Sequence, residues 1–494
     1  MRIIGVVAVA ALVAIPASAT ERLVTGGVVR GTAQTDGSEI FYAIPYAAPP
    51  VGDRRFKPPA PVEPWQGVRD ATLPPAPCLQ HDEGWNSDDA KKSREDCLYL
   101  SVRTPAHKPG DRLPVFFWIH GGSNRAGAGY GYIESTIHRR GIVLVSIEYR
   151  LGVFGFIASH ALSEESPTHS SGNIAILDQI AALRWVKDNI ARFGGDPDNV
   201  TIAGQSAGAS DVGFLMTSPL ARGLFAKAVE ESGTPGGSLP PRSAADNEAL
   251  GAQLMTGLGL ADTADGLKAL RDLPADAVLK QGDKLAPKGI DPSVIWAPAM
   301  LDGYVLPESP RDVFTSGHQA SVPLIIGNNT REFPVEMPED AARMLVKTFY
   351  GANADAALKL YAADDPVLGN LPTRVLSDVI FRCPSNTFAE WQTKAGQKVW
   401  RYQFGLGVPG TGKPVEHSSE LKYVFDDAPP NADFAKWPPL QAYWANFAHT
   451  GDPNGHALPH WPVFGSGANY IDFTLEGPKR GTDLRGPICR LRNP

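Results

Sequence analysis

The pentapeptide GQSAG at residues 204–208 has the residue types and spacing expected around a nucleophilic serine, Ser206. The apolar run 200–204 (VTIAG) leads into it, and a helix-compatible stretch, 209–216, follows. On such a tight strand-to-helix turn, a serine occupies strained backbone and exposes its Oγ to substrate. The alternative is an incidental serine in a glycine-rich turn, but the order of strand, turn and helix favours the nucleophile.

A hydroxyl group is a poor nucleophile until a neighbouring base takes its proton. In chains with this turn, the acid and then the histidine follow the serine in sequence. His417 is our choice of base, because it lies in a loop after the strand-like run 398–404 (KVWRYQF). The acid is expected after an intervening strand, 322–327 (VPLIIG), where Glu332 is preferred and Glu336 is the competitor.

A pair of glycines at 121–122 suits the stabilisation of negative charge on a reacting carbonyl oxygen. The segment HGGS at 120–123 follows the strand-like run 114–119 (PVFFWI). The main-chain N–H groups of Gly122 and Ser123, together with that of Ala207, are predicted to form an oxyanion hole. Loss of one such donor typically lowers the rate by a factor of about 10²–10³. A plain glycine loop is the alternative, and His120 is interpreted as a structural residue of the turn.

The strands that position these residues are recognisable as apolar runs, and a further run lies at 142–149 (IVLVSIEY). Several are almost continuously apolar, which is typical of parallel strands buried on both faces. An apolar helical pattern spans about 174–193 and ends at two glycines and a proline. Strands alternating with helices predict an α/β fold with a largely parallel sheet flanked by helices.

The remaining segments predict the rest of a single domain, residues 20–494. Residues 23–103 contain short strands and proline-rich turns, which indicate an antiparallel edge of the sheet. Residues about 235–300 and 335–395 are helical in pattern and connective. We expect both to form cap insertions over the active edge of the sheet.

The first residues predict export of the protein. Arg2 is followed by an apolar run, 3–15, and by PASA at 16–19, which together describe a signal peptide cleaved after Ala19. A membrane anchor is the alternative, but the run is shorter than the about 20 residues that span a bilayer. The protein is therefore expected to be secreted or periplasmic, with no membrane segment in the mature chain. A net charge of −7 gives no reason to expect nucleic acid as a partner.

Four cysteines in an exported chain suggest disulfides. Three pairings are possible; we prefer the short local pair Cys78–Cys97, which leaves Cys383–Cys489 by elimination. Free buried thiols are the alternative. The segment between the first two cysteines is mostly polar, and Trp85 is its one aromatic side chain.

Taken together, these residues resemble the type-B carboxylesterase/lipase family, which includes the cholinesterases and bacterial para-nitrobenzyl esterases. The similarity runs from about Val28 to about Trp461. The matching segments are Pro49-Pro50 through Arg55-Phe56, Glu95-Asp96-Cys97-Leu98, His120-Gly121-Gly122, Tyr149-Arg150-Leu151-Gly152, Asp178-Gln179, the segment 204–208, Glu332, His417 and Gly451-Asp452-Pro453-Asn454.

The resemblance implies an α/β-hydrolase fold and a catalytic triad of Ser206, Glu332 and His417. It places the Cys78–Cys97 loop beside the active-site gorge and a supporting serine, Ser232, behind the triad. It further implies two ion pairs, Arg55–Glu95 and Arg150–Asp178.

The sequence departs from the family at three places. The residue before the nucleophile is Gln205, where the family usually has Glu. The third glycine of the oxyanion stretch is Ser123, which keeps its N–H but narrows the pocket. Trp85 lies roughly where choline-binding members carry an aromatic residue, at a different offset, so choline recognition is not inferred. Trp85 is interpreted as a substrate-binding residue of the gorge wall or as a packing residue of its loop.

The predicted activity is hydrolysis of small-molecule carboxylic esters through an acyl-enzyme, with no metal and no organic cofactor. His456 and His460 have a metal-like spacing but lie in a proline-containing loop without a third ligand. Two alternatives act on esters: a lipase and a detoxifying esterase for one bulky ester. A third is a non-catalytic adhesion module like the cholinesterase-like neuronal proteins, which predicts a broken triad.

Overall fold

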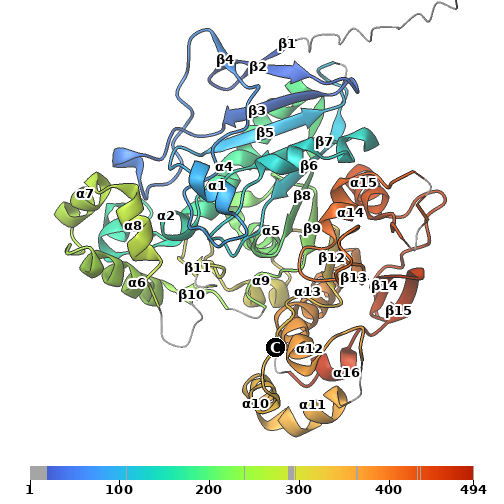
Figure 1. Cartoon of the computed structure of the whole chain (residues 1–494). Coiled ribbons are helices and arrows are strands. Elements are labelled where there is room, and N and C mark those ends of the chain that lie inside the picture. The colour runs from blue at the N-terminus through green and yellow to red at the C-terminus, as the bar shows by residue number, and fades with distance from the viewer. Residues whose placement is uncertain are drawn as a thin grey trace, which may run out of the picture.

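The apolar runs of the sequence form the strands of one large sheet in the computed structural model of the protein (Figure 1). The structure describes residues 19–106, 108–237, 240–286, 294, 296–362, 365–430, 432–433 and 436–492. Within these ranges, thirteen strands pair in the order β1-β2-β3-β5-β7-β6-β8-β9-β12-β13-β14-β15, with β4 beside β2. They are β1 (Ala19–Val24), β2 (Gly27–Ala33), β3 (Glu39–Pro45), β4 (Val68–Asp70), β5 (Tyr99–Thr104), β6 (Leu113–Ile119), β7 (Val143–Ile147), β8 (Gly195–Gln205), β9 (Lys227–Glu231), β12 (Leu324–Asn329), β13 (Val399–Phe404), β14 (Asn469–Thr474) and β15 (Gly477–Thr482). The short strands β10 (Arg242–Ser243) and β11 (Met300–Leu301) pair separately.

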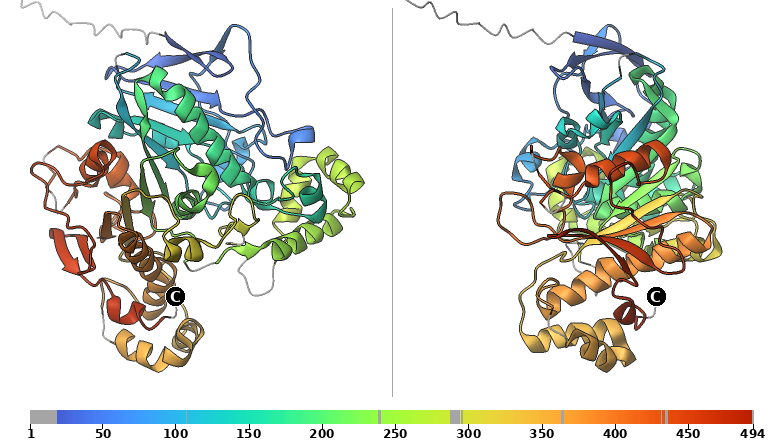
Figure 2. Two further views of the ribbon diagram at one scale, coloured as in Figure 1. Left: turned by 180° about the vertical axis from the view of Figure 1, so that it is seen from behind. Right: turned by 90° about the vertical axis from the view of Figure 1, so that its right-hand side faces the viewer.

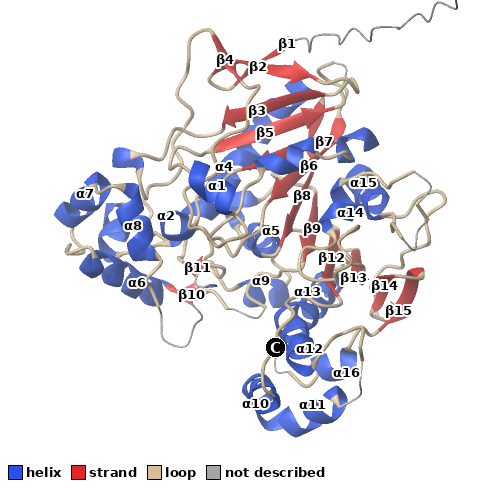
Figure 3. Ribbon diagram, viewed as in Figure 1, coloured by secondary structure: helices blue, strands red, loops and turns tan. Residues whose placement is uncertain are grey.

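Helices lie on both sides of this sheet and in two insertions (Figure 3). They are α1 (Ser87–Lys92), α2 (Gly152–Phe156), α3 (His160–Glu165), α4 (Ile174–Asn189), α5 (Ala207–Thr217), α6 (Ala244–Gly257), α7 (Ala264–Asp272), α8 (Ala275–Gly282), α9 (Pro310–Ser316), α10 (Glu339–Tyr350), α11 (Ala354–Tyr361), α12 (Leu371–Leu376), α13 (Cys383–Lys394), α14 (Leu421–Phe425), α15 (Leu440–Thr450) and α16 (Gly486–Cys489).

The centre of the sheet is parallel and its N-terminal edge is antiparallel, as the sequence predicted. Strands β7, β6, β8, β9, β12, β13 and β14 form a continuous parallel set. Strands β1, β2, β3 and β5 pair antiparallel in turn, and β5 joins β7 antiparallel. At the other edge β15 pairs antiparallel with β14, and the short β4 lies parallel to β2. Strand β6 explains why the central strands are apolar throughout. Phe117 and Ile119 belong to the core on one face, and Phe116 and Trp118 belong to the core on the other.

Two long helices cover the opposite faces of the sheet. Helix α4 contributes Ile180 and Leu183 to the first core, and α15 contributes Trp444 and Phe447 to the second. Figure 2 shows α4 crossing the sheet in the view from behind. Because parallel strands leave no face for water, both helices are needed to bury the sheet.

Both segments predicted as cap insertions are largely helical. Residues 235–300 contain α6, α7 and α8, and residues 335–395 contain α10 to α13. Helix α13 packs along β12 and β13, whereas α10, α11, α12 and α16 share a small core of their own. Figure 1 shows these last helices at the bottom of the molecule, away from the N-terminal edge.

The structure contains both predicted disulfides, Cys78–Cys97 and Cys383–Cys489. It also contains both predicted ion pairs: Arg55 binds Glu95 at 2.6 Å, and Arg150 binds Asp178 at 2.6 Å. Most of the predicted signal peptide, residues 1–18, lies outside the described residues, and Ala19 begins β1. Among the helices that the structure describes, none has the length and apolarity needed to cross a bilayer.

Candidate active site

Ser206 lies at the carboxyl end of β8, where the chain turns into α5. Its backbone angles, φ 57° and ψ −125°, are unusual for a residue with a side chain and cost about 1–3 kcal/mol. The main-chain N–H of Ser206 donates to the carbonyl of Glu231 at 2.8 Å and holds this conformation. A Cβ atom on Gly204 would collide with the backbone of Gly208, so the close approach within the turn requires glycine.

His417 lies in the loop after β13 and contacts both Glu332 and Gln205. Its Nδ1 lies 2.7 Å from Oε2 of Glu332, and its Nε2 lies 3.1 Å from the side-chain amide nitrogen of Gln205. A carboxylate only accepts and an amide nitrogen only donates. With Glu332 ionised, Nδ1 carries the proton, and the lone pair of Nε2, which a general base uses, accepts from the Gln205 amide in this structure.

Glu332 is fully buried in the loop after β12. One carboxylate oxygen binds His417; the other accepts from the Ser232 hydroxyl and from the main-chain N–H of Asn329, both at 2.8 Å. The competing acid, Glu336, is exposed and accepts from Asn370. The structure thus brings Glu332 to the histidine and leaves Glu336 outside.

The loop after β6 carries Gly121 and two members of the predicted oxyanion hole, Gly122 and Ser123. A Cβ on Gly121 would lie 2.5 Å from the carbonyl oxygen of Gln205, so this loop passes directly over the serine turn. Gly122 has a φ of 107° and Ser123 a φ of 56°. Both line the same cavity as Ser206, and Ala207 begins α5, where the first N–H groups of a helix lack intrahelical partners.

His120 precedes these glycines and is buried behind them. Its Nδ1 lies 2.9 Å from the carbonyl oxygen of Gly121, and its ring stacks on Tyr149 with the centroids 4.5 Å apart. Burial lowers the pKa of His120 to about 4, so the ring is neutral at neutral pH. Its Nε2 lies 4.0 Å from a carboxylate oxygen of Glu148, whose pKa burial raises to about 8.

The cavity above Ser206 has a volume of about 600 Å³, within the usual range for small-molecule sites. Its wall combines aromatic and charged side chains with the glycine loop. The lining residues are Glu83, Trp85, Asp89, His120, Gly121, Gly122, Ser123, Arg125, Gly127, Ala128, Tyr132, Gln205, Ser206, Phe333, His417, Ser418 and Leu421.

Trp85 lies on this wall and is 66% exposed, which favours the gorge-wall interpretation over packing within its loop. The buried side chains of the Cys78–Cys97 loop are polar. Asn86 donates to Gln80 at 2.8 Å, and Gln80 in turn accepts from the N–H of Gly127 at 2.7 Å. The hydrogen bond to Gly127, further along the loop that follows β6, therefore fixes the Cys78–Cys97 loop, and the indole is left facing the cavity.

Two aromatic side chains beside the imidazole were missed by the sequence analysis. The rings of Phe333 and Phe381 lie 4.6 and 5.1 Å from the ring of His417. Phe333 follows Glu332 directly in sequence, and its place beside the acid could have predicted that it lies near His417. Phe381 offers no such signal, because it approaches the histidine from a distant helical segment.

Buried carboxyl groups lie behind the catalytic loops. Asn329 donates to the carboxylate of Glu420 at 2.6 Å and to the carbonyl of Glu416 at 3.0 Å, which connects the acid loop to the histidine loop. Burial, together with the charge of Glu332, raises the pKa of Glu420 to about 7. Trp444 donates to Glu231 at 2.7 Å, and burial raises the pKa of Glu231 far above its usual range.

The two histidines with metal-like spacing, His456 and His460, follow helix α15. Nδ1 of His460 lies 3.0 Å from the side-chain oxygen of Asn454. Among the described residues, no group of three His, Cys, Asp or Glu side chains is arranged to hold a metal ion.

Known proteins resemble this chain over most of its length. The family model described as "Carboxylesterase family" matches residues 18–487. The fumonisin B1 esterase of Sphingopyxis macrogoltabida is 34% identical over 86% of this chain and 81% of its own length. The liver carboxylesterase of Sus scrofa is 34% identical over 88% of this chain and 85% of its own length.

A solved structure of a PNB esterase superposes with a TM-score of 0.81 at 30% identity. The match covers 96% of this chain and 99% of the PNB esterase. Sequence and fold therefore agree over nearly the whole length. The chain belongs to the carboxylesterase family and is a carboxylic ester hydrolase with the α/β-hydrolase fold.

Proposed function

We propose that the protein is a serine carboxylesterase in which Ser206, His417 and Glu332 form the catalytic triad. Ser206 Oγ attacks the ester carbonyl while Nε2 of His417 takes its proton. The imidazolium then protonates the leaving alcohol, and a water molecule repeats the cycle on the acyl-enzyme. Glu332 keeps the ring in the required tautomer and stabilises its positive charge.

One observation carries this proposal. Nδ1 of His417 lies 2.7 Å from the buried carboxylate of Glu332, while the Nε2 side faces the serine turn through Gln205. Ser206 and His417 line the same cavity. The hydrogen bond from Ser232 supports the carboxylate from behind at 2.8 Å.

When Ser206 attacks the carbonyl carbon, the negative charge moves to the carbonyl oxygen, and this oxyanion is proposed to bind the N–H groups of Gly122, Ser123 and Ala207. These groups come from two segments that adjoin the nucleophile, and the start of α5 adds the positive end of a helix dipole. Such preorganised donors stabilise charge that develops only in the transition state.

The substrate class that we propose is a small-molecule ester that fits a cavity of about 600 Å³. The names of the relatives refer to different esters, so the acyl and alcohol groups are not inferred from them. A series of p-nitrophenyl esters of increasing chain length distinguishes a short-chain carboxylesterase from a lipase. A non-catalytic adhesion module is disfavoured, because all three triad members are present.

We also propose that the protein is exported after removal of residues 1–19. Two disulfides are compatible with an oxidising compartment such as the periplasm or the extracellular space. Sequencing of the mature N-terminus tests this proposal: cleavage after Ala19 leaves Thr20 as the first residue.

Labelling with a fluorophosphonate probe tests the nucleophile. Wild-type protein should incorporate one equivalent, and Ser206→Ala should lose both labelling and nearly all turnover of p-nitrophenyl acetate. Ser210→Ala, one turn further along α5, is the control and should keep both. Full labelling of Ser206→Ala would overturn the assignment.

A further inference from the structure

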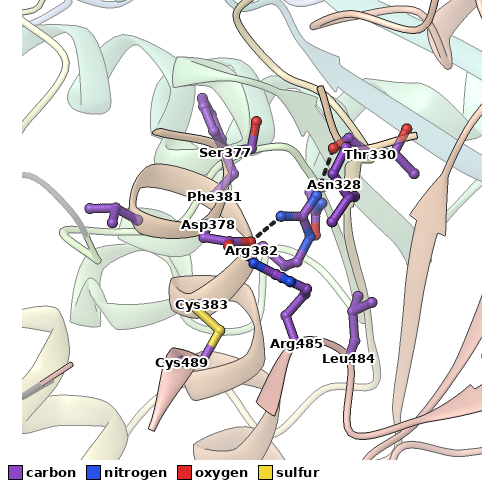
Figure 4. A network of polar contacts seen from close by, with 12 residues as sticks. Asn328, Thr330, Ser377, Asp378, Phe381, Arg382, Cys383, Leu484, Arg485 and Cys489 are labelled. Carbon is purple, nitrogen blue, oxygen red and sulfur yellow. Dashed lines mark hydrogen bonds and ion pairs between the residues drawn. A yellow bond between two sulfur atoms is a disulfide. The ribbon is translucent and has the colours of Figure 1, made fainter. Parts of the chain in front are cut away.

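A short segment outside the triad contacts both the loop of Glu332 and the ring of His417. It is a π-helical turn, η8 (Ser377–Arg382), between α12 and α13. Turns of this kind are rare and often occur at functional sites. Figure 4 shows the turn facing the end of β12, with Arg382 directed toward Asn328 and Thr330.

Three side chains of η8 reach the catalytic loops. The Ser377 hydroxyl accepts from the main-chain N–H of Glu332 at 3.1 Å. Arg382 donates to the carbonyl oxygens of Thr330 at 2.8 Å and Asn329 at 3.3 Å. The Phe381 ring lies 5.1 Å from the imidazole of His417, between centroids.

The π-helical geometry allows these contacts to come from one turn. Hydrogen bonds in a π-helix join residues five apart, so Ser377 and Arg382 return toward the same face. In an α-helix, residues five apart point roughly 140° away from each other. A regular α-helix through this segment would therefore present only part of the set to the catalytic loops.

The guanidinium of Arg382 is fully buried and has a partner in every direction. It pairs with the buried carboxylate of Asp378 in the same turn, and its Nε donates to Gln403 on β13 at 3.1 Å. A buried charge is costly unless its hydrogen bonds are complete. Movement of the Glu332 loop away from η8 would strip Arg382 of two acceptors, so this loop is held in one position.

Contacts with the C-terminal segment and with Tyr361 hold η8 in place. Arg485 donates to the second oxygen of Asp378 at 2.8 Å, and the Tyr361 hydroxyl donates to the same oxygen at 3.0 Å. Cys383, which follows the turn directly, is joined to Cys489. Figure 4 shows this disulfide beside the Asp378–Arg382 pair.

We propose that η8 is the positioning element of the acid–base pair, with Ser377 and Arg382 fixing the loop of Glu332 and Phe381 fixing the ring of His417. The proposal rests on the roles given above to Glu332 and His417. None of the three side chains reacts; each acts by keeping the carboxylate and the imidazole within hydrogen-bonding distance. If Glu332 and His417 move apart, the carboxylate stabilises the imidazolium less, and kcat falls. His417 then takes up its proton at lower pH. The fall of kcat/KM on the acid side of the pH profile, here called the acid limb, therefore moves to lower pH.

Arg382→Lys and Arg103→Lys form a matched pair of variants. Arg103 is also buried and binds one carboxylate, one hydroxyl and two main-chain carbonyls, of Asp36, Ser38, Ile133 and Ser135, on the far side of the sheet. Arg382→Lys should lower kcat by about tenfold or more, with KM within about twofold, and shift the acid limb to lower pH. Arg103→Lys should lower the apparent Tm but leave kcat and the acid limb as in wild type.

Phe381→Leu and Phe381→Tyr supply an independent test if Arg382→Lys does not fold. Phe381→Leu should lower kcat with KM nearly unchanged, and Phe381→Tyr, which keeps the ring, should restore most of it. Wild-type kcat and an unshifted acid limb in both Phe381→Leu and any folded Arg382→Lys would overturn the positioning role. Ser206→Ala distinguishes failure of the η8 proposal from failure of the proposed function. Loss of activity in Ser206→Ala supports the proposed serine mechanism, whatever the η8 variants show. Activity retained in Ser206→Ala would overturn the proposed function itself.

Discussion

Gln205 places a neutral amide, and not a carboxylate, next to the imidazole of His417. Its side-chain amide donates to Nε2 at 3.1 Å, where relatives of the type-B family usually carry Glu. A neutral amide stabilises the neutral imidazole, whereas a carboxylate at the same place would stabilise the imidazolium. The chain has thus exchanged a negative charge for a hydrogen-bond donor at its general base.

Gln205→Glu should therefore move the acid limb of the kcat/KM profile to higher pH by about one unit or more, because the added carboxylate favours protonation of His417. Activity at pH 6 should fall more than activity at pH 8.5. The measurement is a pH–rate profile with a soluble ester. Gln205→Met removes the amide without adding a charge and is the control, so its limb should shift upward less than that of Gln205→Glu. An upward shift as large in Gln205→Met as in Gln205→Glu would contradict this explanation.

Glu332→Gln keeps the shape of the acid and removes its charge. The amide cannot stabilise the imidazolium, so kcat should fall by about 10³–10⁴-fold with KM little changed. Glu336→Gln, four residues away and exposed, is the control and should retain wild-type kinetics. The opposite ranking of the two variants would move the acid to Glu336.

The elements of the fold that leave a pattern in consecutive residues, such as apolar runs and glycine turns, were predicted from the sequence. The runs that became β6, β8, β12 and β13 are apolar because both faces of each strand are buried, and the turn around Ser206 needs glycines that pack against backbone. The π-helical turn η8 was not predicted, because its contacts with the catalytic loops join residues far apart in sequence, as between Glu332 and Ser377, 45 positions apart. Nothing in composition or periodicity reports such a contact.

The Cys78–Cys97 loop is the element expected to control access for bulky esters. Trp85 presents its indole to the cavity beside Gly122, and the polar contacts of the loop hold it there. Trp85→Ala should raise KM for bulky esters more than for acetate esters and leave kcat for acetate nearly unchanged, because the triad is untouched. Leu73→Ala, at an equally exposed apolar side chain that does not line the cavity, is the control.

Removal of the covalent tie tests the same element. Cys78→Ala/Cys97→Ala should lower the apparent Tm, since a closed loop of this length contributes about 3 kcal/mol. It should also weaken binding of bulky esters, as Trp85→Ala does. A variant with lower Tm but an unchanged KM for every ester would separate the loop from substrate binding.

At the scale of the whole molecule, buried carboxyl groups link stability to pH. Burial raises the pKa of Glu148 to about 8 and those of Asp211 and Glu420 to about 7. The carboxyl of Glu148 accepts from the N–H groups of Gly129 and Tyr130, both at 2.9 Å. These acids belong to separate elements: Glu148 follows β7, Asp211 lies on α5 and Glu420 precedes α14. Their effect therefore belongs to the fold and not only to the active site.

The sign of this effect follows from proton binding. An unfolded Glu loses its proton near pH 4.5, whereas the folded protein keeps the proton of Glu148 until about pH 8. Between these values the folded state binds more protons, so the free energy of unfolding falls as pH rises. His120 acts in the opposite direction between about pH 4 and 6.5, because its folded pKa is lowered; above pH 6.5 it no longer offsets the acids.

The apparent Tm, measured at a fixed scan rate, should therefore fall between pH 6.5 and pH 8.5. Glu148→Gln removes one titrating group while its side-chain oxygen can still accept a main-chain hydrogen bond, so its Tm should fall less over the same interval. Glu164→Gln, exposed on α3, is the matched control and should follow the wild-type slope. Equal slopes in all three proteins would show that Glu148 is already ionised in the folded state at pH 6.5. Its two main-chain donors would then outweigh the cost of burying the charge.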